Sequence, residues 1–390
     1  MKFLAIPLTL VVLFASGAAA QTWEPELHMK LKAVGTPRVS PDSKKMVYTV
    51  NEAVMTPDKS EFVSQIWMSN LDTKRNVQLT FGEKSSTNPK WSPDGNWIAF
   101  LSNRKDNRNQ IYLLNLNGGE AEPLTDGKSG VTNFAWSPDG RSIAFTMVDP
   151  KSEEEEKNDK GKNDFRWVDE NFKLARLYVL SIQKDGNGKR EPRKLTTANY
   201  HVEDFDWSND GSRIAFGHVK SPVANDWPTS DVSIVEVASG KISELANSAA
   251  AETSPLYSPD GKSIAVIASD APPRWAGSGV IQIFPGSGGQ PKNAVGSFDA
   301  QPAVAGWSAD GKRIYFSEAK GTGTQIYSLD VAANRIEEIK TTPAVLTAVN
   351  LNSSGTTFAF VRQMSDTPPD AFIASAANFT PVQVTRVNEG

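Results

Sequence analysis

The sequence predicts an all-β protein, a seven-bladed β-propeller built from four-stranded antiparallel blades. A ten-residue pattern, W-S-P-D-G-x-x-I-A-F, returns seven times along the 390 residues in clear or degenerate form. Most copies are followed by signals for two more short strands. Repetition on this length scale is typical of propellers and solenoids, in which a unit buries its faces only against its neighbours.

The copies cover residues 39–48, 91–100, 136–145, 207–216, 257–266, 307–316 and 351–360. The turn position in each copy is occupied by Asp42, Asp94, Asp139, Asp210, Asp260, Asp310 and Ser354. Subtraction gives steps of 52, 45, 71, 50, 50 and 44 residues between these positions. Five of the six steps fit a four-stranded blade, and the longer third step indicates an insertion.

Each copy is interpreted as two strands joined by a tight turn. Proline presets the turn corner, and the glycine that follows the aspartate tolerates positive φ. The I-A-F segment is apolar and β-prone, as expected of an inner strand. A third strand of the type Gln110–Leu114 follows in most copies, and a fourth often ends in Leu-Thr, as at Leu124-Thr125. Four antiparallel strands per repeat make a propeller blade.

The aromatic residue at the head of the pattern is expected to lie between neighbouring blades. This position holds Trp91, Trp136, Trp207, Tyr257 and Trp307. Each such side chain buries on the order of 200 Å². Truncation to alanine is therefore expected to cost roughly 3–5 kcal/mol.

The chain begins with a predicted secretory signal at residues 1–20. Lys2 supplies the charge, residues 3–14 a short apolar stretch, and Ala18-Ala19-Ala20 a small-residue cleavage site before Gln21. Residues 21–37 are expected to form a lead-in with a helix at 23–33, and residues 38–390 the propeller. The insertion at about 150–165 contains Glu153–Glu156 among other charges and is expected to be a solvated loop.

The composition limits the cellular location of the protein and the classes of partner that it can bind. There is no cysteine, so disulfides, thiolate metal sites and a lipoprotein anchor are excluded. The net charge of −4 argues against nucleic acid as a partner. No hydrophobic run after the signal is long enough to cross a bilayer. A periplasmic or secreted protein fits these observations.

The search for chemistry predicts no catalytic, cofactor-binding or metal site. The nucleophile pattern G-x-S-x-G is absent, and the Gly127–Gly130 and Gly286–Gly289 segments are interpreted as turns. Asp185–Gly188 resembles part of a calcium loop but is most simply a hairpin turn.

The three histidines and one acidic cluster are candidates for a metal or binding site. His28 lies in the expected helix, whereas His201 and His218 could approach each other across one hairpin, with no third metal ligand at suitable spacing. Glu203, Asp204 and Asp206 form an acidic group that a blade-entry loop could use. We expect the I-A-F segments to form the inner strands. Because these segments are apolar, they disfavour a catalytic site inside the central channel.

The repeat resembles the propellers of two groups of bacterial proteins. One is the amino-terminal propeller of prolyl oligopeptidase-like serine peptidases (family S9), including dipeptidyl peptidase IV-like and acylaminoacyl peptidase-like enzymes. The other is the propeller of TolB-type periplasmic proteins. Three segments resemble the peptidase group: the entry at 34–42, the segment 166–179 and the end at 380–388. TolB-type proteins carry a separate α/β domain before the propeller.

The resemblance implies two functions. The first is the substrate-gating propeller of a secreted S9-type peptidase, with peptides at its funnel and the catalytic Ser, Asp and His in an α/β-hydrolase domain outside these 390 residues; some peptidase propellers present glutamates from an insertion to a substrate's amino terminus. The alternative is a TolB-like propeller that holds a protein partner at its rim loops. A third reading, a lyase or glycosidase with its site in the channel, lacks the clustered histidines or paired carboxylates that it needs.

Overall fold

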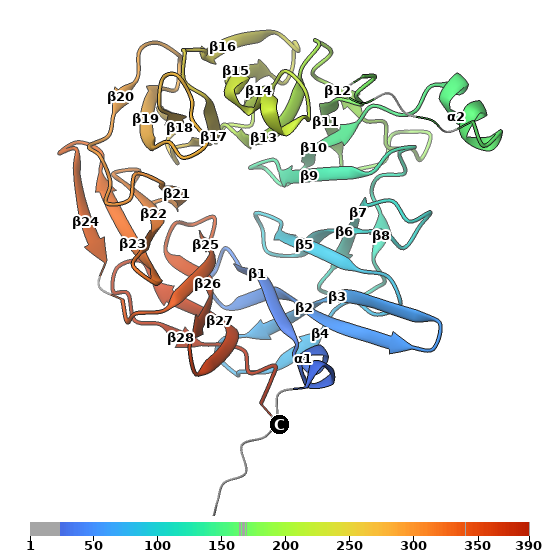
Figure 1. Cartoon of the computed structure of the whole chain (residues 1–390), viewed down its shortest axis with the longest axis horizontal. Coiled ribbons are helices and arrows are strands. Elements are labelled where there is room, and N and C mark those ends of the chain that lie inside the picture. Colours follow the sequence, from blue (N-terminus) through green and yellow to red (C-terminus); the bar gives the residue numbers. More distant parts are fainter. Residues whose placement is uncertain (1–23, 164, 166–167, 169, 340, 390) are drawn as a thin grey trace, which may run out of the picture.

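The structure, a computed structural model, describes residues 24–389 apart from 164, 166–167, 169 and 340. Seven four-stranded antiparallel sheets are arranged in a ring around a central channel (Figure 1). The predicted fold class is therefore confirmed. The predicted signal at residues 1–20 lies outside the described residues.

Each blade is made of four strands consecutive in the chain. Blades one to four comprise β1 Ala33–Val39, β2 Lys45–Thr56, β3 Lys59–Asn70 and β4 Asn76–Gln78; β5 Ser86–Trp91, β6 Trp97–Ser102, β7 Gln110–Asn115 and β8 Glu122–Pro123; β9 Val131–Trp136, β10 Ser142–Val148, β11 Ala175–Ser181 and β12 Arg193–Lys194; β13 His201–Trp207, β14 Arg213–Val219, β15 Asp231–Glu236 and β16 Ile242–Ala246.

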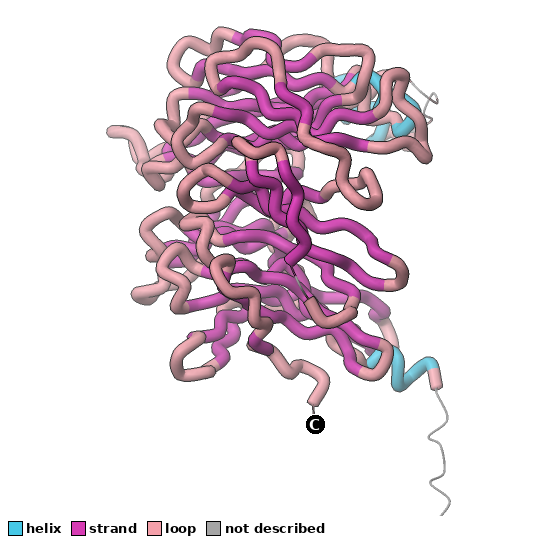
Figure 2. The backbone as a smooth tube through the Cα atoms, turned by 90° about the vertical axis from the view of Figure 1, so that its left-hand side faces the viewer, coloured by secondary structure: helices cyan, strands magenta, loops and turns pink. Residues whose placement is uncertain are grey.

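Blades five to seven comprise β17 Glu252–Tyr257, β18 Ser263–Ser269, β19 Gly279–Pro285 and β20 Lys292–Asn293; β21 Ala303–Trp307, β22 Arg313–Lys320, β23 Gly323–Asp330 and β24 Arg335–Ile339; β25 Val345–Leu351, β26 Thr357–Met364, β27 Thr367–Ser375 and β28 Val382–Gln383. The helices are α1 Pro25–Lys30, α2 Glu153–Lys160 and the 3₁₀ turn η1 Ala224–Thr229. Both α-helices project on the same side of the ring (Figure 2).

The Ser-Pro-Asp-Gly turn is stabilised by its own side chains. The Ser137 hydroxyl donates to Asp139 Oδ1 at 2.5 Å, and its oxygen accepts the Ser142 N–H at 2.9 Å. Asp139 Oδ1 also accepts the Arg141 N–H, and these bonds hold the pKa of Asp139 below its usual value. Gly140 adopts φ 67°, which explains the glycine.

The hydrophobic core consists of seven clusters among the described residues, each shared by two neighbouring blades. Between blades two and three, for example, Ile111 and Leu113 pack with Phe134, Ile143 and Phe145. The last residue of the repeat is buried in every blade: Tyr48, Phe100, Phe145, Phe216, Val266, Phe316 and Phe360. A blade therefore has no core of its own, which makes the ring the unit of stability.

The motif tryptophans lie between the blades, as predicted. Each indole N–H donates to the backbone carbonyl of the residue before the aromatic position in the preceding blade. The four bonds are Trp91 to Arg38 (2.8 Å), Trp136 to Lys90 (3.2 Å), Trp207 to Ala135 (3.4 Å) and Trp307 to Leu256 (3.2 Å). The bond removes the cost of burying the indole donor inside an apolar interface.

The ring closes between blades seven and one without strand exchange, because β1 pairs only with β2 and β28 only with β27. The two degenerate repeats meet at this seam. Asn350 Nδ2 donates to the Pro37 carbonyl at 3.0 Å, and Asn352 Nδ2 donates to Ser40 at 3.3 Å. At this seam asparagine amides donate across the interface, whereas four of the other interfaces have an indole donor.

Three boundaries differ from the sequence-based expectations. Within the described residues the first helix spans Pro25–Lys30 and so ends before the expected residue 33, and the first blade already begins at Ala33, ahead of the expected boundary at residue 38. The insertion is not all loop, because α2 forms within it. The Ser152 hydroxyl oxygen accepts the Glu155 N–H, and the Glu155 carboxylate accepts the Ser152 N–H. These two hydrogen bonds form a capping box at the start of the helix. The helix buries no residue, so its acidic face is solvated as expected.

We expect Trp136→Ala to lower the free energy of unfolding by roughly 3–5 kcal/mol, because it leaves a cavity between blades two and three. Urea unfolding followed by circular dichroism measures the change. Trp275→Ala is the control, since Trp275 is 73% exposed and its loss should fall within about 0.5 kcal/mol of the parent chain. Equal losses in the two variants would contradict the proposed interface role.

Candidate functional site

The strand next to the central channel is the first strand of each blade (Figure 1). The I-A-F segment lies in the second strand, one position further out, so the expectation that I-A-F lines the channel was wrong. In blade two the channel strand is β5, whose sequence Ser-Thr-Asn-Pro-Lys-Trp is largely polar. The strand nearest the channel therefore contains polar residues, and not the apolar I-A-F segment that the sequence pattern suggested.

Every channel strand contains an irregularity in its pairing with the second strand, consistent with a β-bulge. Thr36, Asn88, Ser254 and Ala348 have positive φ within these irregularities. A bulge re-aims the side chains that follow it and increases the local twist. The position before the aromatic residue lies after the irregularity and holds polar residues in four blades: Arg38, Lys90, Asp206 and Asn350.

Lys90 reaches from blade two to blade three. Its ammonium donates to the Phe134 carbonyl and, at 3.3 Å, to Asn133 Oδ1, and it lies 4.9 Å from the Phe134 ring centre. Burial, with a smaller contribution from the Arg38 charge, lowers the pKa of Lys90 to about 7, whereas Asp206 acts in the opposite direction. Lys90 is thus a polar link between blades whose charge changes near neutral pH.

The predicted acidic group lies in β13, a channel strand, and not in a loop. Asp206 Oδ2 accepts the Tyr257 N–H of blade five at 2.8 Å, and burial raises the pKa of Asp206 to about 6. Asp204 Oδ2 accepts the Ser254 N–H at 2.9 Å, and burial raises its pKa also. Glu203 is exposed. Two of the three carboxylates therefore join blades four and five rather than forming one site.

The two histidines of blade four do not come together. His201 pairs with Val219 and His218 with Val202, so their side chains lie on opposite faces of the sheet. His201 Nδ1 accepts the Ala175 N–H at 3.0 Å. His218 Nε2 is 2.9 Å from Ser233 Oγ, but Ser233 is only 3% exposed, so this pair is closed to a substrate.

The remaining candidate segments form a hairpin turn and a helix cap. Asp185 accepts the N–H groups of Asn187 (2.9 Å) and Lys189 (2.8 Å) in the hairpin between β11 and β12, which confirms a turn. Glu155, in the acidic run, caps α2 and pairs with Lys173 at 2.7 Å. Within the described part of the chain, no group of three or more His, Asp or Glu side chains is placed to hold a metal ion.

One face of the ring carries the loops between second and third strands and the links from blade to blade; we call it the connection face. The exposed aromatic side chains of the described residues all lie in the segments that form it: Phe62, Phe81, Phe165, Phe172, Trp275 and Phe298. Scattered exposed apolar residues are ordinary, but their concentration on one face is typical of an interaction surface.

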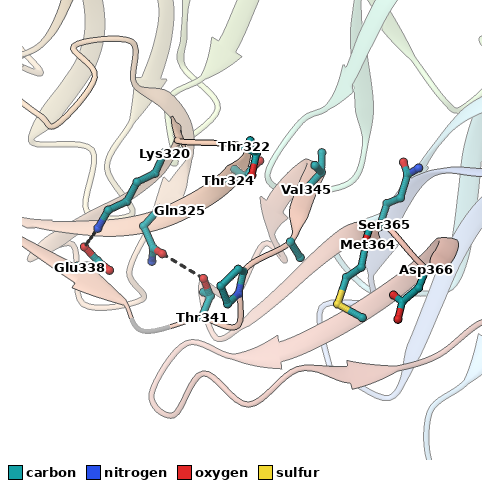
Figure 3. Close-up of a pocket in the computed structure, with 14 residues that line it drawn as sticks. Lys320, Thr322, Thr324, Gln325, Glu338, Thr341, Val345, Met364, Ser365 and Asp366 are labelled. Carbon is teal, nitrogen blue, oxygen red and sulfur yellow. Dashed lines mark hydrogen bonds and ion pairs between the residues drawn. The ribbon is translucent and has the colours of Figure 1, made fainter.

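The connection face also carries a hollow of about 920 Å³ between blades six and seven. The Lys320–Glu338 ion pair (2.5 Å) and the Thr341–Gln325 hydrogen bond (3.1 Å) form one wall, and Met364 and Asp366 of the β26–β27 hairpin lie opposite (Figure 3). The hollow is open, and its lining mixes polar side chains with apolar ones such as Val345 and Met364.

No helix within the described residues is long and apolar enough to cross a membrane.

Comparison with known proteins agrees with this architecture. Residues 27–175 match the PD40 family, described as the TolB beta propeller domain. Dipeptidyl-peptidase 5 of Porphyromonas gingivalis is 30% identical over 340 residues, which are 81% of this chain and 49% of that protein. The chain carries a PD40-type propeller, and S9 peptidases are among its homologues. It spans about half the length of the dipeptidyl-peptidase 5 that it matches.

Two solved structures share the fold of this PD40-type propeller. The acylaminoacyl peptidase of Pyrococcus horikoshii superimposes with a TM-score of 0.69 at 16% identity, covering 94% of this chain and 55% of its own. The β-propeller domain of the trilobed protease from Pyrococcus furiosus, which has an open velcro topology, gives 0.63 at 15% identity and covers 92% and 97%. The open seam between blades seven and one is of the same kind.

We expect the Lys90 amine to titrate with a midpoint near pH 7, followed by its side-chain ¹³Cε resonance. Because folding lowers this pKa from its ordinary value of 10.5, the unfolded chain binds the proton more tightly and stability should rise between about pH 7 and 10.5. Lys90→Met should flatten that rise. Lys220→Met, at an exposed lysine, is the control; a Lys90 midpoint above 10 would contradict the assignment.

Proposed function

We propose that this chain is the substrate-gating propeller of an S9-type serine peptidase that acts on peptides in the periplasm or outside the cell. The similarity to dipeptidyl-peptidase 5 over 81% of the chain is the observation that carries the proposal. The predicted signal at residues 1–20 supports the location. In this proposal the ring admits extended peptides and the hydrolase domain performs the cleavage.

The connection face supports the proposal physically. β1 begins and β28 ends there, and Lys32 and Asn388 join the two ends through a pair of hydrogen bonds of 2.8 and 2.9 Å. A hydrolase domain attached beyond either end would thus lie beside the exposed aromatic residues. Burying an exposed phenylalanine against such a domain would contribute about 1.5–3 kcal/mol.

A TolB-like scaffold that holds a protein partner is the second candidate, favoured by the PD40 match over residues 27–175. The DNA beyond codon 390 separates the two. An in-frame continuation or adjacent frame with G-x-S-x-G supports the peptidase, whereas a stop codon followed by unrelated genes supports the scaffold.

We expect the purified 390-residue chain to show no hydrolysis of chromogenic peptide substrates, because no catalytic triad is recognised in it. Under the peptidase proposal, adding the hydrolase domain as a separate polypeptide should give a stable complex, measured by light scattering after gel filtration. Phe62→Ser with Phe298→Ser should weaken this complex. Val382→Ser, at an exposed position on an outer strand, is the control.

Robust turnover by the chain alone would overturn the proposal, since it would reveal a catalytic centre within these residues. A complex that is insensitive to the phenylalanine substitutions would show that the hydrolase domain does not use the connection face.

A further inference from the structure

Blade four departs from a polar contact that other blades repeat. In blades one, two and seven, the threonine of the Leu-Thr segment donates to a side chain at the start of the buried part of the third strand. The bonds are Thr80 to Gln65 (2.7 Å), Thr125 to Gln110 (2.7 Å) and Thr385 to Asp370 (2.6 Å). In blade four the same two positions hold Ala246 and Asp231, so the carboxylate has lost its hydroxyl donor.

Asp231 is not compensated in any other way that the described residues show, since no hydrogen bond or ion pair reaches its side chain. Burial, then the charges of Glu252 and Glu244, raise its pKa to about 6. Neither glutamate has a cationic partner in the described structure either. Two basic side chains of blades four and five pair elsewhere, Lys220 with Asp226 and Arg274 with Asp270.

Glu252 is the most confined of the three carboxylates. It is only 1% exposed, yet it lines a hollow of about 470 Å³ between blades four and five. Its Oε1 accepts the Ser248 N–H at 3.2 Å and the Ser248 hydroxyl, whereas its Oε2 is buried without a partner. A buried carboxylate oxygen without a donor is costly, and a cationic donor in the hollow would relieve that cost.

The chemistry of the hollow fits an organic cation. The described carboxylates are not placed to hold a metal ion. The amides of Gln282, Gln290 and Asn293 also line the hollow and offer further polar contacts. A guanidinium or ammonium group carries several N–H donors, which suits a site made of carboxylate and amide oxygens.

Two tryptophans lie close to this site along the chain of hydrogen bonds. The Glu252 N–H donates to the Ser230 carbonyl at 2.8 Å, and the Ser230 N–H donates to Trp227 at 3.1 Å. The Trp227 ring is 5.3 Å from that of Trp275, whose side chain is 73% exposed. Tryptophan faces attract cations, and the pair offers a fluorescent reporter of binding nearby.

We propose that the hollow between blades four and five is a binding site for a guanidinium or alkylammonium group, held by Glu252 and the amide side chains that line it. Asp231 does not line the hollow but adds negative charge beside it, since it precedes Val232, the strand partner of the lining residue Ala246. The inference does not depend on whether the chain serves a peptidase or a scaffold, because it rests on the unpartnered Oε2 of Glu252 in blade five and the unpaired Asp231 of blade four. The cation is either a free small molecule or the side chain of a basic residue in a peptide.

Binding is tested with the full chain by calorimetry and tryptophan fluorescence. The probes are agmatine, the capped peptide Gly-Gly-Arg-Gly-Gly, and the same peptide with citrulline, which keeps the shape of arginine but not its charge. We expect saturable one-to-one binding of a guanidinium probe and none of the citrulline peptide. Binding of agmatine as tight as that of the peptide identifies a free cation, and preference for the peptide identifies a basic side chain.

Three substitutions place the site. Glu252→Gln should weaken binding about tenfold or more, the effect of losing a charged hydrogen bond, and Asp231→Asn should weaken it by less, because Asp231 adds charge without lining the hollow. Ala246→Thr should also weaken it, because the restored hydroxyl occupies Asp231 as in the other blades. Glu120→Gln, which removes one exposed charge from blade two, should leave the affinity unchanged.

Stability distinguishes binding from folding. Asp231→Asn and Ala246→Thr should raise the melting temperature above pH 6 while they weaken binding, since each relieves an uncompensated carboxylate. Equal affinity for the arginine and citrulline peptides, absence of binding by every probe, or undiminished binding in the Glu252→Gln and Asp231→Asn variants would overturn the proposal.

Discussion

The contact on which the rest of the structure depends is the one between neighbouring blades. A four-stranded blade is too thin to bury its own side chains, so each of the seven apolar clusters is shared by two blades. Four of these interfaces contain a motif tryptophan whose indole N–H is satisfied by a carbonyl of the preceding channel strand. Apolar burial and a satisfied polar group therefore come from one side chain repeated around the ring.

The fold was predictable because the repeat combines local and global information in the same ten residues. The Ser-Pro-Asp-Gly turn fixes a hairpin, the aromatic residue marks the blade interface, and the spacing gives the number of blades. The sequence pattern did not indicate where the two degenerate copies lie in the ring. They form the seam, where Asn350 and Asn352 replace the aromatic contact and no strand is exchanged.

The chemistry near the channel was less predictable. The apolar I-A-F strand was assigned to the channel, whereas the polar strand before the turn lies there, because alternation alone does not say which strand is innermost. Bulges in the channel strands then decide where Lys90 and Asp206 point. The helix at Glu153–Lys160 was foreseeable, since Ser152 and Glu155 have capping-box spacing. That Asp231 lacks a hydroxyl donor becomes evident only when the equivalent strand positions of the blades are compared.

The functional features follow from departures from this regular frame. The connection face concentrates exposed aromatic residues because its loops are free of the ring's packing constraints. The site between blades four and five exists because a threonine of the repeat became Ala246, which leaves charge uncompensated in an otherwise satisfied blade. In both places the repeat supplies a rigid support, and deviations from the repeat supply the recognition.

Hydrogen exchange measured by mass spectrometry tests most directly whether the interblade contacts, and not the individual blades, hold the ring together. The seam lacks a motif tryptophan, so backbone amides of β1 and β25 should exchange by an opening of lower free energy than those of β6 and β10, which flank tryptophan interfaces. Slower exchange at the seam than at β6 and β10, or blades that exchange independently of their neighbours, would contradict the account.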